Sequence, residues 1–147
     1  MVLGIDMTQD FILHKQLAVD CIILTELPLS TLLLCNDSQY PWFILVPRLP
    51  GISEIYQMPL EQQYQFLAES SALSEIVMEE FLGDKMNVAA LGNMVPQLHI
   101  HHVVRFKNDI SWPKPIWGLK PLIPYNGEAI ANIKNNIVPK LLSKCST

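Results

Sequence analysis

Short apolar runs, separated by turn residues, dominate the first third of the chain. Residues 21–26, 30–35 and 42–46 are mostly apolar, the first run is also β-branched, and proline or an Asn-Asp-Ser cluster lies between them. Runs of this length with turn signals between them predict an antiparallel meander of three strands. Residues 85–91 and 97–106 have the same character and lie on either side of a Gly-Asn turn, so they predict two further strands.

Between the third and fourth predicted strands, the apolar residues recur every three or four positions. This period predicts one long amphipathic helix that starts near Pro59, where proline suits the first turn. Gly83 is the expected terminator of the helix, because glycine accepts the left-handed conformation at little cost. The pattern therefore predicts an α+β fold in which an antiparallel sheet of about five strands is accompanied by one long helix.

The chain beyond residue 106 has a different character. The proline-rich segment 112–118 carries two tryptophans and predicts an ordered loop that packs through their rings. Residues 126–142 are compatible with a helix up to Pro139. A chain of 147 residues, of which 50% are hydrophobic, can fill one sizeable core. We therefore expect a single domain over 1–147, with 107–147 as a loop and a helical C-terminal extension.

Charge and cysteine content argue against several classes of protein. A net charge of -4 argues against a general nucleic-acid binder, which normally carries a basic stripe. Cys21, Cys35 and Cys145 are odd in number and show no C-x-x-C spacing, so neither a disulfide framework nor a zinc knuckle is expected, and a reducing cytoplasm fits best. The sequence lacks the long apolar stretch of a membrane span, and residues 1–20 lack the order of a signal peptide.

Three of the four histidines lie on the last predicted strand. Polar and apolar residues alternate there from Gln97 to His101, which predicts a strand with one buried and one functional face. The functional face is expected to hold Gln97, His99, His101 and Arg105, and the opposite face Leu98, Ile100, His102 and Val104. Neighbours on one face lie about 6.6–6.8 Å apart, so two imidazoles there can act on one phosphate-sized group. The unperturbed pKa of imidazole lies near neutrality, which suits nucleophilic and proton-transfer work.

The run VPQLHIHHV at 95–103 resembles the signature of the histidine triad (HIT) superfamily, in which three histidines alternate with apolar residues along a strand. The order of the elements is similar as well, because a strand meander, the WFILVPR strand at 42–48 and a long helix precede the histidines. The resemblance covers roughly residues 15–108. It implies a HIT-like fold, a nucleotide or nucleotide-derived small molecule as the ligand, and a homodimer.

The resemblance also implies chemistry at the α-phosphate of a nucleoside phosphate, phosphoramidate or dinucleoside polyphosphate. His99 matches the middle histidine, which in the family attacks phosphorus and forms a nucleotidyl-histidine intermediate that water or another acceptor resolves. Its attacking nitrogen must be unprotonated, so the other ring nitrogen is expected to donate to a fixed acceptor such as a backbone carbonyl. His101 matches the third position, where it can donate to a phosphate oxygen or assist the leaving group. Gln97 replaces the first histidine and carries no titrating proton, so hydrolase and transferase outcomes both stay open.

Four further residues are expected to contact the nucleotide. Backbone amides near Asn93 and Met94 follow a turn and can donate to the phosphate, and the Asn93 side chain is a candidate contact of its own. Asn36 and Asp37 lie at the end of the second predicted strand, where the resemblance places contacts to the ribose hydroxyls. No metal or other cofactor is expected, because an oriented neutral imidazole is a sufficient nucleophile.

Each of these candidates also has a structural interpretation, and two other functions stay open. His99 and His101 can be half-buried packing residues, and His102 is expected to contact the helix layer, the core or a subunit interface. One alternative is a metal-dependent enzyme that uses His99 and His101, although no further ligand follows at a short spacing. The other is a catalytically weak nucleotide-binding or interaction module in which Gln97 marks lost turnover.

Overall fold

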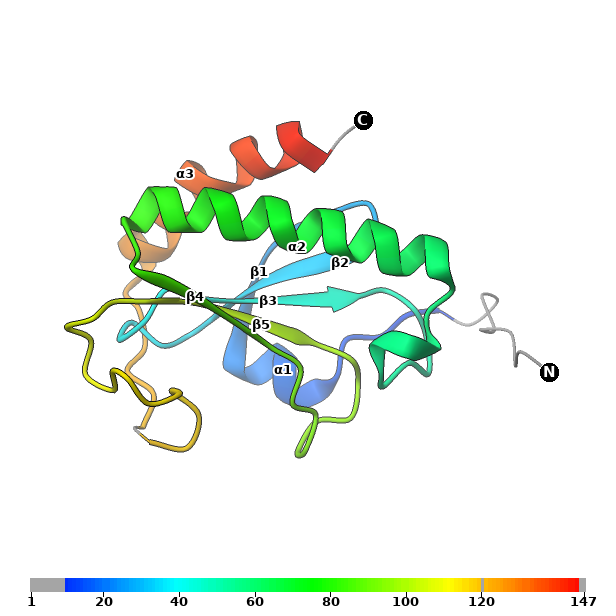
Figure 1. Cartoon of the computed structure of the whole chain (residues 1–147), viewed down its shortest axis with the longest axis horizontal. Coiled ribbons are helices and arrows are strands. Elements are labelled where there is room, and N and C mark those ends of the chain that lie inside the picture. The colour runs from blue at the N-terminus through cyan, green and yellow to red at the C-terminus, as the bar shows by residue number, and fades with distance from the viewer. Residues whose placement is uncertain (1–9, 120, 146–147) are drawn as a thin grey trace.

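The chain folds into a five-stranded antiparallel sheet with helices on both faces, in a computed structural model that describes residues 10–119 and 121–145 (Figure 1). The strands are β1 (Cys21–Glu26), β2 (Ser30–Cys35), β3 (Trp42–Pro47), β4 (Lys85–Ala89) and β5 (Ile100–Arg105), in the sheet order β1-β2-β3-β5-β4. The helices are α1 (Lys15–Asp20), the short 3-10 helix η1 (Ile55–Gln57), α2 (Leu60–Phe81) and α3 (Gly127–Cys145). The predicted α+β class and strand number are confirmed. None of the helices in the described ranges is long and apolar enough to cross a membrane.

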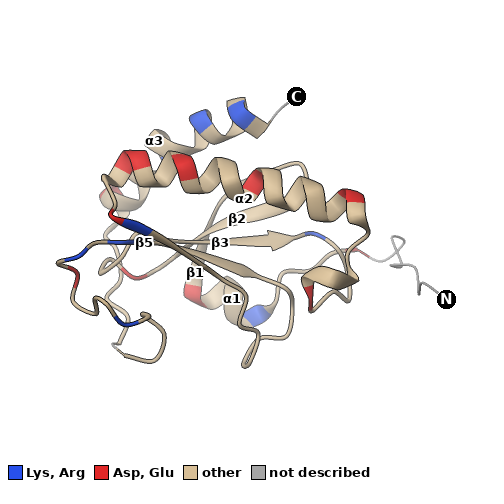
Figure 2. Cartoon of the chain, in the orientation of Figure 1, with Lys and Arg blue, Asp and Glu red and all other residues tan. Residues whose placement is uncertain are grey.

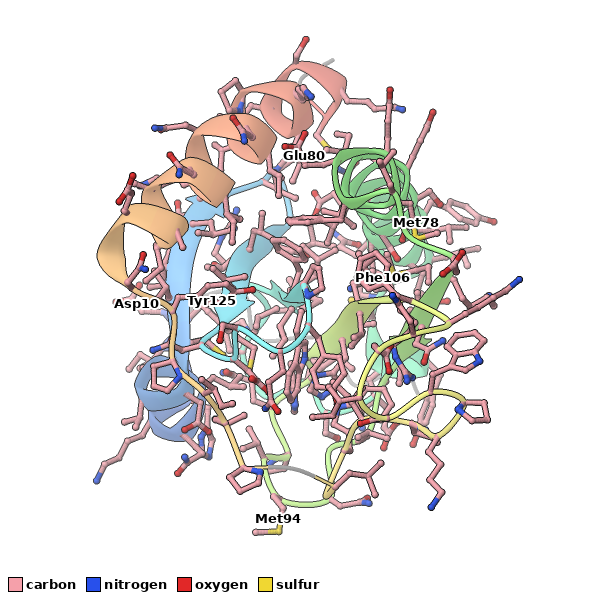
Figure 3. All side chains as sticks on the ribbon, turned by 90° about the vertical axis from the view of Figure 1, so that its left-hand side faces the viewer. Asp10, Met78, Glu80, Met94, Phe106 and Tyr125 are labelled. Carbon is pink, nitrogen blue, oxygen red and sulfur yellow. The ribbon has the colours of Figure 1, made fainter. Side chains whose placement is uncertain are left out.

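The two faces of the sheet are covered unequally. α2 crosses one face with α3 beside it, and the short α1 lies on the other face (Figures 1 and 3). The larger apolar cluster joins the sheet to α2 and α3, and its members include Phe43, Leu45, Leu73, Val77 and Leu141. The smaller cluster on the α1 side includes Leu17, Leu33, Ile44 and Val46. Because both faces are covered, β2 is buried along its whole length, which explains the uninterrupted apolar run at 32–35.

The long helix ends on a different residue from the predicted one. Leu82, and not Gly83, takes the left-handed conformation with φ 53°. Leu82 is 84% exposed, so packing in the core does not account for this conformation. Gly83 is needed for a different reason, since a Cβ at that position would collide with Cγ1 of Val104 and Sδ of Met78. The glycine therefore permits a close passage of the chain from α2 into β4 across the end of β5.

The C-terminal helix continues through Pro139 to Cys145, so the expectation that it ends at the proline is wrong. Proline removes one helical hydrogen bond and normally kinks or breaks a helix. Here Ile137 and Leu141 lie on either side of the proline, and both are completely buried in the main core. Their burial outweighs the lost hydrogen bond and holds the last turns of α3 on α2.

Charged residues mark the outer surfaces of these two helices. Figure 2 shows acidic residues along α2 and basic residues on the last turns of α3. Lys140 pairs with Glu80 at 3.4 Å, and Lys144 pairs with Glu75. Such solvent-exposed pairs contribute between about 0 and 1 kcal/mol each, so the apolar contacts decide how α3 packs.

One carboxylate is buried beneath α2 and fastens it to the turn between β1 and β2. Glu69 is completely buried, and its side-chain oxygens accept the backbone N–H groups of Leu29 at 2.8 Å and Ser30 at 3.0 Å. Nε2 of Gln65 also donates to Oε2 of Glu69 at 2.8 Å. These bonds satisfy two backbone amides at the start of β2 that would otherwise lack partners. The apolar periodicity of α2 gives no sign of this residue.

Candidate active site

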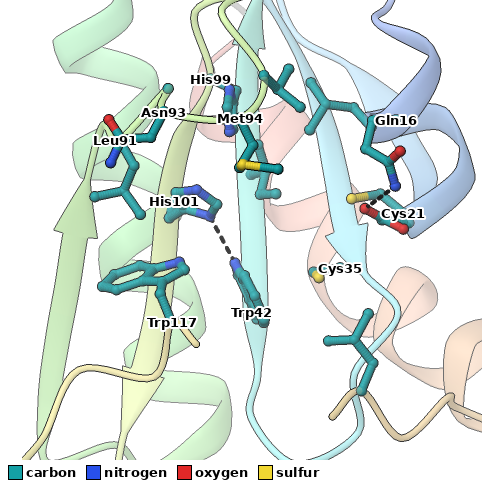
Figure 4. Close-up of a pocket in the computed structure, with 16 residues that line it drawn as sticks. Gln16, Cys21, Cys35, Trp42, Leu91, Asn93, Met94, His99, His101 and Trp117 are labelled. Carbon is teal, nitrogen blue, oxygen red and sulfur yellow. Dashed lines mark hydrogen bonds between the residues drawn. The ribbon is translucent and has the colours of Figure 1, made fainter. Parts of the chain in front are cut away.

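A pocket of about 430 Å³ lies on the α1 side of the sheet (Figure 4). β3 and β5 contribute Trp42 and His101, and the loop between β4 and β5 contributes Asn93 and Met94. α1, β1 and β2 line another side, and Trp117 and Leu122 reach in from the C-terminal extension. Figure 3 shows Met94 at the end of the molecule opposite α2 and α3, so the pocket lies away from the main core. Its size is that of an ordinary small-molecule site.

His99 lies immediately before β5 and is held by the backbone. Its side chain lines the pocket and is 7% exposed, and its Nδ1 lies 2.8 Å from the carbonyl oxygen of Gln97. A carbonyl only accepts, so the proton of the neutral ring lies on Nδ1 and the lone pair on Nε2. The backbone acceptor expected from the sequence is therefore present.

His101 is the second imidazole of the pocket, and its ring centroid lies 5.0 Å from that of His99. Nε1 of Trp42 donates to its Nδ1 at 3.0 Å, and the Trp117 ring packs against it edge-on at 5.3 Å between centroids. Burial, together with the neighbouring His99 and His102, lowers the pKa of His101 to about 3. His101 is therefore neutral at physiological pH.

His102 points to the opposite face of the sheet, as the alternation predicts. It is completely buried against α2, where its Nε2 lies 2.7 Å from Oγ of Ser70 and its Nδ1 lies 3.0 Å from the carbonyl oxygen of Ile100. Burial lowers the pKa of His102 to about 4, although the hydrogen bond to Ile100 opposes the shift. Its contacts give His102 a role in packing.

Gln97 does not join the two histidines in the pocket. β5 begins at Ile100, so the strand alternation that placed Gln97 beside His99 does not extend back to residue 97. Its side-chain Oε1 accepts the backbone N–H of His14 at 2.8 Å, and its Nε2 donates to the carbonyl of Ile12 at 2.8 Å. The side chain of Gln97 ties down the segment before α1, and the part of this residue that reaches the site is its backbone carbonyl.

The four predicted nucleotide contacts divide into two pairs. Asn93 and Met94 line the pocket, whereas Asn36 and Asp37 are not among its lining residues. Oδ1 of Asn36 accepts the backbone N–H of Tyr125 at 2.9 Å, and Oδ1 of Asp37 accepts the N–H groups of Gln39 and Ile123. Both side chains thus hold the C-terminal segment that brings Leu122 to the pocket. A ribose contact from either residue stays a prediction.

Arg105 was expected on the functional face with the histidines, but it is not among the residues that line the pocket, and its contacts are with the loop that follows β5 and with neighbouring side chains. The guanidinium is buried, pairs with Asp109 at 2.8 Å and donates to Oδ1 of Asn87 at 2.9 Å. It also packs on the rings of Tyr40 and Trp112. Burial alone would raise the pKa of Asp109, but the hydrogen bonds from Arg105 and three backbone amides outweigh it and lower the pKa to about 2. This network anchors the loop that carries Trp117.

The pocket has an unusual charge pattern for a phosphate site. Among its described lining residues, Asp20 is the one carboxylate and none is Lys or Arg. Donors in the pocket are therefore neutral groups: imidazole and indole N–H groups, side-chain amides and backbone amides. Within residues 10–119 and 121–145, no three His, Cys, Asp or Glu side chains gather in a way that could hold a metal ion.

Sequence reasoning missed Trp42 and the residues of α1, β1 and β2 that line the pocket. The pairing of β3 with β5 places Ile44 opposite His101, so Trp42 lies diagonally across from His101 on the same face. That pairing joins segments far apart in the chain. The one available signal in the sequence was a tryptophan at the start of a predicted strand, and such a residue is equally typical of core packing.

The two low histidine pKa values predict acid sensitivity of the fold. In the unfolded chain, His101 and His102 take up protons near pH 6.5, whereas the pKa values in the folded protein are about 3 and about 4. Below pH 6.5 the unfolded chain therefore binds more protons than the folded protein, and protonation favours unfolding. The stability that the two neutral histidines allow is complete above pH 6.5 and is lost as the pH falls toward the folded pKa values. The free energy of unfolding in urea should drop between pH 6.5 and 5 by about 1.4 kcal/mol per pH unit for each histidine at most. His102→Gln should remove one histidine's share of this slope. A free energy of unfolding that is constant over this range would contradict the assignment.

Comparison with known proteins connects this site to a family. Residues 16–108 match the family described as HIT domain. A histidine triad protein from Marinobacter aquaeolei VT8 is 55% identical with a TM-score of 0.90, covering 94% of this chain and 100% of that chain. A histidine triad protein from Bradyrhizobium japonicum is 38% identical with a TM-score of 0.89, covering 90% and 99%. One from Sinorhizobium meliloti 1021 is 31% identical with a TM-score of 0.87, covering 93% and 99%. No protein of curated function matches the sequence.

Proposed function

The chain belongs to the HIT family, and from this premise we propose that it is a nucleotide-binding enzyme in which His99 attacks the α-phosphorus of its substrate. The substrate class is a nucleoside phosphate, a nucleoside phosphoramidate or a dinucleoside polyphosphate. The family relationship supports nucleotide chemistry, and the pocket around His99 supports its location.

The observation that carries the proposal is the hydrogen bond between Nδ1 of His99 and the carbonyl oxygen of Gln97. This bond keeps the proton on Nδ1 and leaves the lone pair on Nε2, as a nucleophile requires. When Nε2 bonds to phosphorus, the ring becomes cationic, and the same carbonyl then stabilises the Nδ1–H. Gln97 therefore contributes to the reaction through its main chain.

The reaction proceeds in two displacements. Nε2 of His99 forms a bond to the α-phosphorus while the bond from phosphorus to the leaving group breaks, and the leaving group takes that electron pair. Water, or another acceptor, then forms a bond to phosphorus and releases its proton to the solvent, and the P–N bond breaks to return its electron pair to Nε2. Hydrolysis releases the nucleoside monophosphate, and transfer to another acceptor leaves the nucleotide on that acceptor.

Neutral donors meet the charge on the phosphoryl oxygens in this proposal. His101 supplies one imidazole N–H, and the loop between β4 and β5 supplies backbone amides near Asn93 and Met94. Within the described part of the chain, the amides of Gly92, Asn93 and Met94 form no hydrogen bonds with other residues, which supports their use by a ligand. The apolar walls of the pocket, including Leu17 and Leu122, suit the uncharged part of a nucleoside.

Incubation with adenosine phosphoramidates and dinucleoside polyphosphates tests the proposal. Release of AMP that scales with protein concentration supports it, and chromatography resolves AMP from both kinds of substrate. Nucleotide binding by calorimetry without any release or transfer would contradict the enzyme and favour a binding module.

We also propose that the protein is a homodimer that works in a reducing cytoplasm. Exposed apolar side chains support self-association: Tyr56, Leu60, Tyr64 and Leu67 are each more than half exposed, and the last three recur at helical spacing along one face of α2. All three cysteines are free thiols, which agrees with a reducing compartment. Light scattering on purified protein should give twice the mass of one chain, and the mass of one chain would contradict the dimer.

A further inference from the structure

The two imidazoles of the pocket carry their protons on opposite ring nitrogens. Nδ1 of His99 faces a carbonyl, which only accepts, so His99 is protonated on Nδ1. Nδ1 of His101 instead faces the indole N–H of Trp42 at 3.0 Å, and an indole N–H only donates. Nδ1 of His101 must therefore be the acceptor, and the proton of this neutral ring lies on Nε2. Figure 4 shows Trp42 and His101 joined by this bond across the pocket floor.

We propose that Trp42 is a positioning residue that fixes His101 as a neutral Nε2–H donor, so that the site favours substrates whose leaving group departs as an anion. The assignment of the proton on His101 stands independently of any reaction. The preference between leaving groups rests on the proposed function.

Packing holds this arrangement in place. Trp42 and His101 lie on paired strands and share one face, and the Trp117 ring packs edge-on against His101. The centroids of the Trp42 and His101 rings are 5.7 Å apart, and His101 is 6% exposed. An imidazole in contact with two indole rings has little room to rotate or to exchange its hydrogen-bond partner.

The surroundings of His101 also disfavour its charged form. The titratable neighbours in the same segment are His99, just before β5, and His102 on β5, and the other walls of the pocket add Asp20, Cys21 and Cys35. Asp20 is the one carboxylate among them, and it accepts a hydrogen bond from Gln16. His101 thus has an adjacent imidazole and a donor on Nδ1, and both oppose a second proton.

The protons that His99, His101 and Trp42 hold determine which kind of leaving group the site favours. A neutral His101 that lost its Nε2 proton would become an imidazolate, so it can donate a hydrogen bond to an oxygen but does not give up the proton. His99 holds its proton against a carbonyl, and Trp42 has no acidic group. A phosphate leaving group is stable as an anion after the P–O bond breaks and takes the electron pair. An amine leaving group needs a proton that these three residues do not supply, so we expect dinucleoside polyphosphates to react faster than phosphoramidates.

Nitrogen NMR of the imidazole rings tests the role of Trp42 without requiring turnover. In the wild-type protein, His101 should show protonated Nε2 and unprotonated Nδ1 from pH 5 to pH 8. Trp42→Phe removes the indole N–H and should move the Nδ1 signal or mix the two neutral forms. Trp117→Phe is the matched control, because Trp117 touches the same ring without a hydrogen bond, and it should leave the His101 proton on Nε2. Unchanged His102 signals show that each variant is folded.

Two NMR results would overturn the proposal: a proton on Nδ1 of His101 in the wild type, or identical His101 signals in the wild type and folded Trp42→Phe.

Kinetics then test the leaving-group preference. With a dinucleoside polyphosphate, Trp42→Phe should lower kcat by about tenfold to a hundredfold and change KM by less than about threefold. In the wild type, kcat/KM should be at least about tenfold higher for the dinucleoside polyphosphate than for an adenosine phosphoramidate. An equal or reversed preference would contradict the proposed selectivity for anionic leaving groups. Turnover of neither substrate would refute the proposed function, and the NMR result would then decide the role of Trp42.

Discussion

His99→Ala is expected to lower kcat for release of AMP by about a thousandfold or more while leaving the fold intact. The substitution removes the only ring nitrogen that the proposal uses to form the bond to phosphorus, and losses of this order accompany removal of a catalytic nucleophile. His99 precedes β5 and lines the pocket, so the main core beneath α2 is untouched. Steady-state kinetics and a urea unfolding curve on the same preparation give both quantities.

His102→Ala provides the matched control, because His102 lies three residues further along the chain, on β5, and faces the opposite side of the sheet. It removes a completely buried side chain that lies 2.7 Å from Oγ of Ser70, so the free energy of unfolding should fall by about 2–4 kcal/mol. Turnover should persist at temperatures where this variant is folded. The two variants thus separate activity from stability, and full turnover by folded His99→Ala would remove His99 from the mechanism.

Glu69→Ala is expected to destabilise the fold by about 3–5 kcal/mol, the largest stability loss that we predict. The substitution leaves the backbone N–H groups of Leu29 and Ser30 buried without their acceptor and opens a cavity under α2. Urea unfolding at pH 7 measures the change. The loss should appear chiefly as a lower midpoint, since the surface exposed on unfolding is little altered.

Glu75→Ala is the control for this prediction, because Glu75 lies on the same helix but its carboxylate is exposed and pairs, within the described ranges, with Lys144 alone. The expected loss is below about 1 kcal/mol. If the two glutamate variants unfolded at the same urea concentration, the buried hydrogen bonds of Glu69 would not have the role that we assign to them.

The local patterns of the sequence were sufficient to predict the sheet and the sorting of the histidines. Alternation along one strand placed His99 and His101 on the pocket side and His102 on the helix side, and the structure confirms this division. The pattern could not show that β5 begins at Ile100, so it assigned Gln97 to the strand face. A strand boundary depends on which backbone groups form hydrogen bonds across the sheet, and the local sequence does not determine those partners.

The parts of the site that sequence reasoning missed all depend on contacts between distant segments. Trp42 reaches His101 only because β3 pairs with β5, and the side chain of Asn36 accepts the backbone N–H of Tyr125 in the C-terminal extension. Glu69 binds amides about forty residues earlier in the chain. A polar residue with such a partner has no periodic signature, because its partner is chosen by the tertiary fold.

The structure of the protein bound to a nucleoside monophosphate tests the central claim most directly. We predict that the phosphorus lies within about 3–3.5 Å of Nε2 of His99, the distance of an attacking atom, and that a phosphate oxygen accepts a hydrogen bond from Nε2 of His101. A nucleotide whose phosphorus lies in another part of the molecule, with His99 still bound to the carbonyl of Gln97 and facing no phosphate, would contradict the assignment of His99 as the nucleophile.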